Sequence, residues 1–176
     1  MTAPAMSGCL YYVIIVDDYS RKTYFISWRL WVKLSTFIEK QIGSHIRALR
    51  SDGEFDSHHL KDLCWEAGIK RELSVPDNPQ QNGVAERKNR TICEAAKAMM
   101  HDLDLPTSIW AEVAGTAFYV QNRCPHFILG DKTPEEKFTG VKPDVEHLRI
   151  FGCPVYIHVP KEKRSKLEPS VRMVSL

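Results

Sequence analysis

Two carboxylates lie where an α/β protein gathers the polar groups of a site. Asp52 follows the short alternating segment 45–50, and Glu86 lies in the first turn of a long segment with helical periodicity. Strand ends and helix starts of this kind surround the ligand sites of α/β folds. Two carboxylates there suit Mg²⁺, and paired metal ions stabilise both the attacking and the leaving oxygen of an in-line phosphoryl displacement. A plain turn at Asp52 and ordinary helix-dipole complementation by Glu86 remain the alternative.

Basic and amide side chains follow Glu86 directly. Asn89 and Arg90 lie three and four residues beyond Glu86, so a helix presents them on its face, and Arg87 and Lys88 extend the cluster. A second basic cluster lies within residues 161–166. The formal net charge is only +2, so any nucleic-acid role must depend on such local patches. Each patch taken alone also fits a solvated surface.

An alternating series of strands and helices must position these residues. Hydrophobic patterning predicts strands at 10–16, 23–28, 45–50, 70–75 and 154–159. It predicts helices at 31–42, 57–67, 84–102 and 107–122, and a short capped helix beginning within 131–136. This order predicts an α/β sheet covered by helices. A change of composition near residue 125 predicts two domains, 1–125 and 126–176, the second ending in a basic tail.

The five cysteines are odd in number, widely spaced and without a C-x-x-C pair. This pattern predicts reduced, mostly buried thiols in the nucleus or cytoplasm. The longest apolar run is far too short to span a membrane, and the first residues do not resemble a signal peptide. We therefore expect no membrane partner.

Two unusual motifs, LRSD at residues 49–52 and PQQNGVAERKNRT at residues 79–91, resemble those of the copia-type retrotransposon integrases. Leu49-Arg-Ser-Asp52 resembles the strand that carries the family's second acidic residue, and the unusual segment 79–91, PQQNGVAERKNRT, is closely similar to the one that carries the third. Segments 16–21, 132–136 and 147–153 resemble further parts of the family's core and its downstream extension. The resemblance covers about residues 11–167.

The resemblance implies a ribonuclease-H-like mixed sheet flanked by helices. It implies that Asp52 and Glu86 are catalytic ligands of Mg²⁺ or Mn²⁺, used in DNA integration by strand transfer. It also implies that Arg87, Lys88, Asn89 and Arg90 contact DNA. The expected partners are element DNA ends, target DNA and other integrase chains.

The sequence departs from the family pattern in two places. The family's first acidic residue lies on a strand upstream of the hairpin, but no acidic residue precedes Asp17, and Asp17 and Asp18 are typical turn residues. We therefore expect the first ligand and the central strand to be absent. The stretch Asp52-Gly-Glu-Phe55 is also two residues shorter than the family's Asp-Asn-Gly-Gly-Glu-Phe. Metal geometry tolerates little displacement, so we expect an impaired or inactive enzyme.

Three hypotheses remain open from the sequence. The chain is a truncated integrase core with residual chemistry, a non-catalytic remnant that binds nucleic acid or pairs with intact integrase, or a decayed reading frame without a function as protein. Neutralising Asp52 and Glu86 separates the first two, because phosphate contacts survive that change and catalysis does not.

Overall fold

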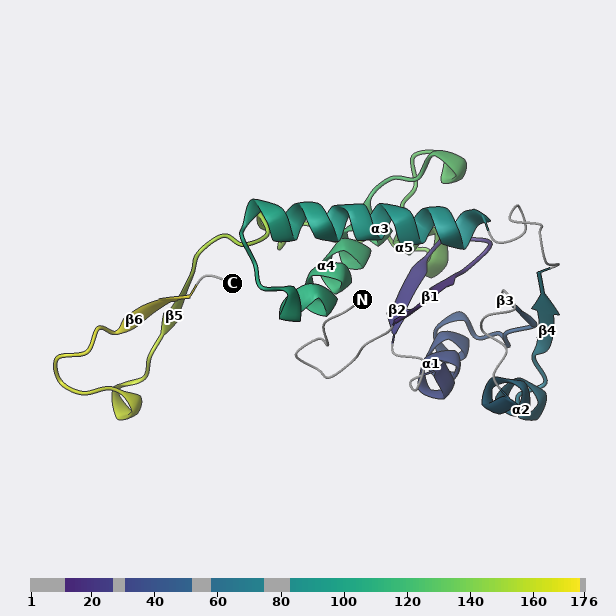
Figure 1. Ribbon diagram of the computed structural model, residues 1–176, viewed down its shortest axis with the longest axis horizontal. Helices are drawn as coiled ribbons and strands as arrows, with labels where there is room; N and C mark the ends of the chain where they lie inside the picture. The colour runs from purple at the N-terminus through teal and green to yellow at the C-terminus, as the bar shows by residue number, and fades with distance from the viewer. Residues whose placement is uncertain (1–11, 27–30, 52–57, 75–82, 175–176) are drawn as a thin grey trace.

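The computed structural model describes residues 12–26, 31–51, 58–74 and 83–174. Within these ranges strands and helices alternate through the first half of the chain, and helices dominate from residue 83 to residue 139 (Figure 1). The predicted α/β class is confirmed. The described strands form three two-stranded sheets, two of them surrounded by helices.

The first sheet is an antiparallel hairpin of β1 (Val13–Val16) and β2 (Thr23–Ile26), in which Val16 pairs with Thr23. Its turn is fixed by Asp17, whose Oδ2 accepts hydrogen bonds from the Ser20 amide at 2.7 Å and the Ser20 hydroxyl at 2.5 Å. Asp18 pairs with Arg21 at 2.6 Å. Both aspartates therefore serve the turn, as the sequence predicted.

The second sheet is the parallel pair of β3 (Ala48–Ser51) and β4 (Lys70–Leu73), joined through α2 (His58–Glu66). A parallel pair requires such a crossover. Both strands end at the same edge of the sheet, after Ser51 and Leu73, and the chain next enters α3. β1 and β3 are not paired with each other in the described part of the chain. The predicted strands are thus present with their order intact.

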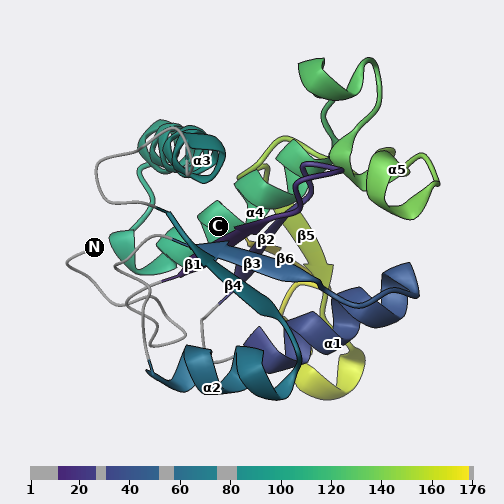
Figure 2. The ribbon, with the colours of Figure 1, turned by 90° about the vertical axis from the view of Figure 1, so that its right-hand side faces the viewer.

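The larger core lies between the two longest helices and the hairpin. α3 (Gly83–Asp102) packs along α4 (Trp110–Arg123), which follows the short 3-10 turn η4 (Thr107–Ile109), and β1 and β2 contact these helices (Figures 1 and 2). The buried residues of this cluster are Ile92, Ala96, Val113, Ala114, Ala117 and Phe118. The predicted apolar stripe of α3 is thus buried at its middle, whereas Val84 and Leu103 at its ends are exposed.

A smaller core surrounds α2. Leu60, Cys64 and Ile69 are buried there, and Ile15 of β1 and Leu49 of β3 pack against them. Ile14, the neighbour of Ile15, packs against the larger core. Successive strand residues point to opposite faces, so β1 lies between the two cores and holds them together. α1 (Trp31–Ile42) has the bounds that the sequence predicts and ends at Gly43, whose φ is 66°.

The segment after α4 is attached firmly to the hairpin. α5 (Pro134–Thr139) begins with Thr133 as its N-cap and ends at Gly140, whose φ is 77°. The ammonium of Lys22, in the hairpin turn, lies 2.9 Å from a Glu135 carboxylate oxygen and over the Phe138 ring. The start of the second domain at residue 126 stays a prediction.

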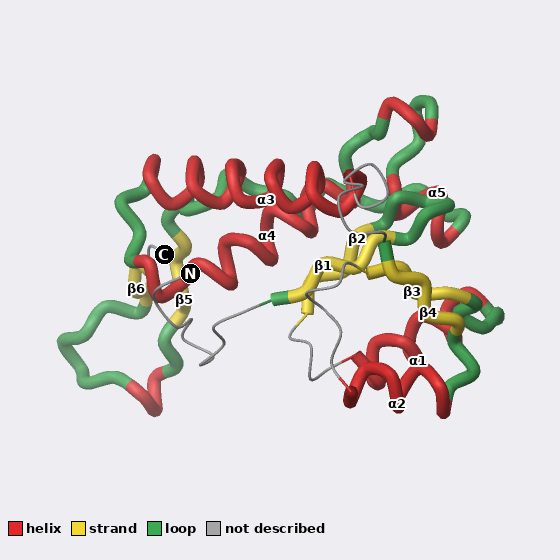
Figure 3. The backbone as a smooth tube through the Cα atoms, turned by 45° about the vertical axis from the view of Figure 1, so that its right-hand side comes forward, coloured by secondary structure: helices red, strands yellow, loops and turns green. Residues whose placement is uncertain are grey.

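A third sheet lies at the other end of the molecule from β3 and β4 (Figure 3). It is an antiparallel hairpin of β5 (Val155–His158) and β6 (Val171–Val174), with the 3-10 turn η6 (Lys161–Lys163) between them. The sequence predicted β5 but assigned β6 to a basic tail. That assignment was wrong, because the four residues of β6 gain strand structure from pairing with β5, which no local pattern reports.

The prediction of mostly buried cysteines was also wrong for the described residues. Cys64 is buried, but Cys93 and Cys153 are only partly buried and Cys124 is exposed. These four thiols are all free.

Candidate nucleic-acid interface

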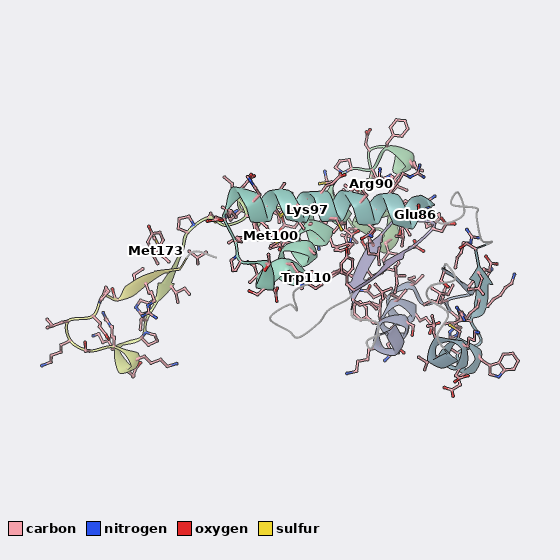
Figure 4. All side chains as sticks on the ribbon, in the orientation of Figure 1. Glu86, Arg90, Lys97, Met100, Trp110 and Met173 are labelled. Carbon is pink, nitrogen blue, oxygen red and sulfur yellow. The ribbon has the colours of Figure 1, made fainter. Side chains whose placement is uncertain are left out.

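Glu86 lies in the first turn of α3 and is exposed to solvent (Figure 4). A carboxylate at this end of a helix is stabilised by the unsatisfied amides of the first turn. Asp52, the other predicted metal ligand, lies outside the described residues and follows Ser51, the last residue of β3, in the sequence. The predicted pairing of Asp52 with Glu86 therefore stays a prediction.

Two of the four predicted DNA contacts have partners inside the protein. The Tyr12 hydroxyl donates to Asn89 Oδ1 at 2.7 Å and lies 3.2 Å from the Cys93 sulfur. Burial, and then the hydrogen bond with Cys93, raise the pKa of Tyr12 far above its usual range, so the phenol remains a donor. Asn89 thus joins α3 to the residue before β1, which sets the position of the helix against the hairpin.

Lys88 is half-buried and points toward α4. Its ammonium donates to Gln121 Oε1 at 3.1 Å, and burial lowers its pKa. This contact connects α3 with α4 near the end of α4. Lys88 is therefore a less accessible cation than its place in the sequence suggests.

The other two predicted contacts, Arg87 and Arg90, are exposed. Seven residues beyond Arg90, the exposed Lys97 lies on the same side of α3, because seven residues complete about two helical turns (Figure 4). Sequence reasoning missed Lys97, although its spacing from Arg90 was available. Glu86, Arg90, Glu94 and Lys97 thus share one exposed side of the helix, which we call the outer face of α3.

A second group of cations comes together only through the fold. Arg21 of the hairpin turn and Lys88 of α3 both lower the pKa of His126, although burial of the ring contributes more to that shift. These three residues are far apart in the sequence, so no spacing could have revealed their proximity. They lie where the loop that follows α4 begins.

A complete metal site is not formed within the described ranges. No three His, Cys, Asp or Glu side chains there approach closely enough to hold a metal ion. Glu86 offers one exposed hard oxygen ligand, the type that Mg²⁺ prefers, but a single carboxylate does not define a site. The binding of Mg²⁺ or Mn²⁺ therefore stays a prediction from the sequence.

The fold has a counterpart among solved structures. It is similar to a chain in the cryo-EM structure of the simian T-cell lymphotropic virus intasome in complex with the PP2A regulatory subunit B56 gamma, with a TM-score of 0.57. The similarity covers 90% of this chain and 58% of that chain, at 14% sequence identity. The chain therefore shares its α/β fold with that chain.

Curated relatives define the family more closely. The chain is 39% identical, over 96% of its length, to the retrovirus-related Pol polyprotein from transposon TNT 1-94 of Nicotiana tabacum. It is 30% identical, over 90% of its length, to the Pol polyprotein from transposon RE2 of Arabidopsis thaliana. No family model matches. The chain is thus a homologue of copia-type retrovirus-related Pol polyproteins and forms an integrase-like region of that family.

The chain spans only 13% and 11% of the length of these two polyproteins. The activities of the whole polyproteins therefore cannot be assigned to this region from the similarity alone. Among the described helices, none is both long enough and apolar enough to cross a membrane.

Proposed function

We propose that this chain binds DNA along the outer face of α3, and that its ancestral activity is DNA integration by metal-dependent strand transfer. The observation that carries the proposal is the pair of exposed cations, Arg90 and Lys97, which lie among the carboxylates of Glu86 and Glu94 on one side of a long helix. The homology to Pol polyproteins and the integrase-like fold support it.

Each group on this face has a role that its chemistry allows. Arg87, Arg90 and Lys97 neutralise phosphates, which positions the DNA without reading its sequence. The hydrogen bonds of Asn89 and Lys88 keep α3 fixed against the hairpin and α4, so the cations are held in place before DNA arrives. Partners of the chain in this proposal are element DNA ends, target DNA and other integrase chains.

Asp52 and Glu86 are the proposed ligands of Mg²⁺ or Mn²⁺. The metal would supply polarisation of the phosphate and activation of the attacking hydroxyl. The sequence Asp52-Gly-Glu-Phe55 is two residues shorter than the corresponding family motif. We therefore propose that this chain joins DNA poorly or not at all, while binding is retained.

The test is a joining assay on a labelled oligonucleotide duplex in Mg²⁺ and in Mn²⁺, with filter binding of the same duplex alongside. We expect salt-sensitive binding with little or no joined product. Any product should disappear in Asp52→Asn and in Glu86→Gln, while both variants still bind. Product that survives both substitutions would contradict the assignment of the ligands, and an absence of binding would contradict the DNA-binding function.

Binding without any joining is the second candidate function. It is favoured by the exposed Arg87 and Arg90 of α3, which can contact phosphates even where the set of metal ligands is incomplete. Here Asp52→Asn and Glu86→Gln should leave DNA affinity unchanged or slightly higher, since each removes a negative charge near phosphate. A chain that shows neither joining nor binding would instead support the decayed reading frame.

A further inference from the structure

The loop between α4 and α5 carries an apolar tip that is fully exposed. Phe127 is 97% exposed and its neighbour Ile128 is 67% exposed, and they lie in the 3-10 turn η5 (Phe127–Leu129). Figures 1, 2 and 3 all show this loop standing out from the body of the molecule. Phe127 is the most exposed aromatic side chain among the described residues.

Hydrogen bonds hold the loop in this shape. The Leu129 amide donates to the His126 carbonyl at 2.8 Å, and the His126 amide donates to the Lys132 carbonyl at 3.2 Å across the base. The Ile128 amide donates to His126 Nδ1 at 3.3 Å. Gly130, with a φ of 67°, allows the chain to reverse. The tip is therefore presented in a set conformation.

The base of the loop is fixed to the body as well. Thr133 accepts a hydrogen bond from the Glu136 amide at 3.1 Å and starts α5, which Lys22 holds through Glu135 at 2.9 Å. Phe127 is thus displayed from a firm support. Both faces of this exposed phenyl ring are therefore accessible to a ligand.

Cationic groups surround the base of the loop. Lys88 and Arg21 lie close enough to His126 to influence its protonation, and Lys132 is exposed where the loop returns to the body. The carboxylate of Asp18 pairs with Arg21 at 2.6 Å and offsets its positive charge. The exposed carboxylate of Asp131 offsets part of the positive charge of the other basic side chains. Lys132 leaves an exposed positive charge at the base of the loop that carries Phe127. This combination is typical of sites that stack unpaired bases and hold the adjoining phosphates.

We propose that Phe127 stacks on an unpaired base at a DNA end, while the exposed Lys132 contacts a neighbouring phosphate. This inference rests on the proposed DNA-binding function and names its substrate class more narrowly. The preferred ligand is a duplex with an unpaired overhang, because an overhang leaves whole bases free to stack, whereas a blunt duplex exposes only the outer face of its terminal base pair. Ile128 provides apolar contact beside the ring.

The experiment compares two fluorescent duplexes with the same phosphate count, one blunt and one with an overhang carrying 2-aminopurine. The wild-type chain should bind the overhang more tightly and quench 2-aminopurine. Phe127→Ala should weaken overhang binding about tenfold, the size expected for one lost stack, with little effect on the blunt duplex. Phe127→Tyr should restore both affinity and quenching.

The control variant is Trp65→Ala, which removes another aromatic side chain, 88% exposed, from α2. It should bind both duplexes as the wild type does. Because both positions are exposed, circular dichroism should show unchanged folding in each variant.

Two results would overturn the proposal. One is Phe127→Ala binding the overhang as tightly as the wild type. The other is Phe127→Ala changing the sedimentation coefficient of the DNA-free chain, because the tip would then dock on another copy. A wild-type chain that binds neither duplex would overturn the proposed DNA-binding function itself.

Discussion

His126 couples the shape of the loop after α4 to pH. Its Nδ1 accepts a hydrogen bond from the Ile128 amide at 3.3 Å. This nitrogen must be unprotonated for His126 to cap the 3-10 turn η5. Burial, and then the charges of Lys88 and Arg21, lower the pKa of the ring below the usual value for histidine. The neutral form and the hydrogen bond therefore support each other.

The sign of the pH effect follows from this shift. The unfolded chain takes up a proton at the ordinary pKa of histidine, near 6.5, before the folded chain does. The contribution of His126 to stability is full above that value. It declines as the pH falls toward the folded pKa and levels off below it. Nuclear magnetic resonance titration should give a folded pKa below that of an unstructured histidine.

Lys88→Met is the matched variant for this titration. It removes one charge that disfavours imidazolium, so the pKa of His126 should rise toward the ordinary value. An unchanged pKa in the variant would contradict the proximity of Lys88 and His126. Lys33→Met on α1 removes an exposed charge elsewhere and should leave the His126 titration as it is.

At the scale of the elements, one buried amide joins α4 to the hairpin. Asn122 Nδ2 donates to the Thr23 carbonyl at 2.7 Å, and Asn122 Oδ1 accepts from the Thr23 amide at 2.9 Å. Both backbone groups of Thr23 are buried and point away from β1 in this pairing. The Asn122 side chain thus satisfies the two backbone groups of Thr23 as a neighbouring strand would.

Asn122→Ala should destabilise the chain by about 1–3 kcal/mol for each backbone group that it leaves unpaired. Urea unfolding followed by circular dichroism measures this change. Thr116→Ala on the same helix removes a hydroxyl that bonds only to the Glu112 carbonyl, and should cost far less. Equal losses in the two variants would contradict the role assigned to Asn122.

The sequence predicted the elements well where their periodicity was long. α1 has the predicted bounds, and α3 begins one residue before the predicted start, because twelve to twenty residues give a clear apolar stripe. Four-residue strands carry too little pattern, and β6 was missed for that reason. Asp17 was interpreted correctly because its turn chemistry is local.

The contacts of the site residues were harder to predict from the sequence. Arg87 and Arg90 were predicted as DNA contacts and are exposed, as that role requires. Asn89 and Lys88 have internal partners, Tyr12 and Gln121, that lie far away in the sequence. The approach of Arg21 to His126 also depends on tertiary packing. The linear pattern placed the cations on α3 but could not distinguish structural side chains from accessible ones.

At the scale of the whole molecule, the chain is nearly neutral and the outer face of α3 is itself mixed in charge. The formal net charge is +2, and on the outer face of α3 Arg90 and Lys97 lie among the carboxylates of Glu86 and Glu94. Homology and fold place the chain among integrase-like regions of Pol polyproteins. A DNA-binding role therefore depends on this one face and not on the overall charge.

The most direct test of that role is the salt dependence of DNA affinity, measured by fluorescence anisotropy on a blunt duplex. Affinity should fall steeply with salt, and Arg90→Ala and Lys97→Ala should each weaken binding and reduce the log–log slope by about 1. Lys33→Ala, on α1, should leave the slope unchanged. Equal slopes for all four proteins, or binding that does not respond to salt, would contradict the outer face of α3 as the DNA-binding surface.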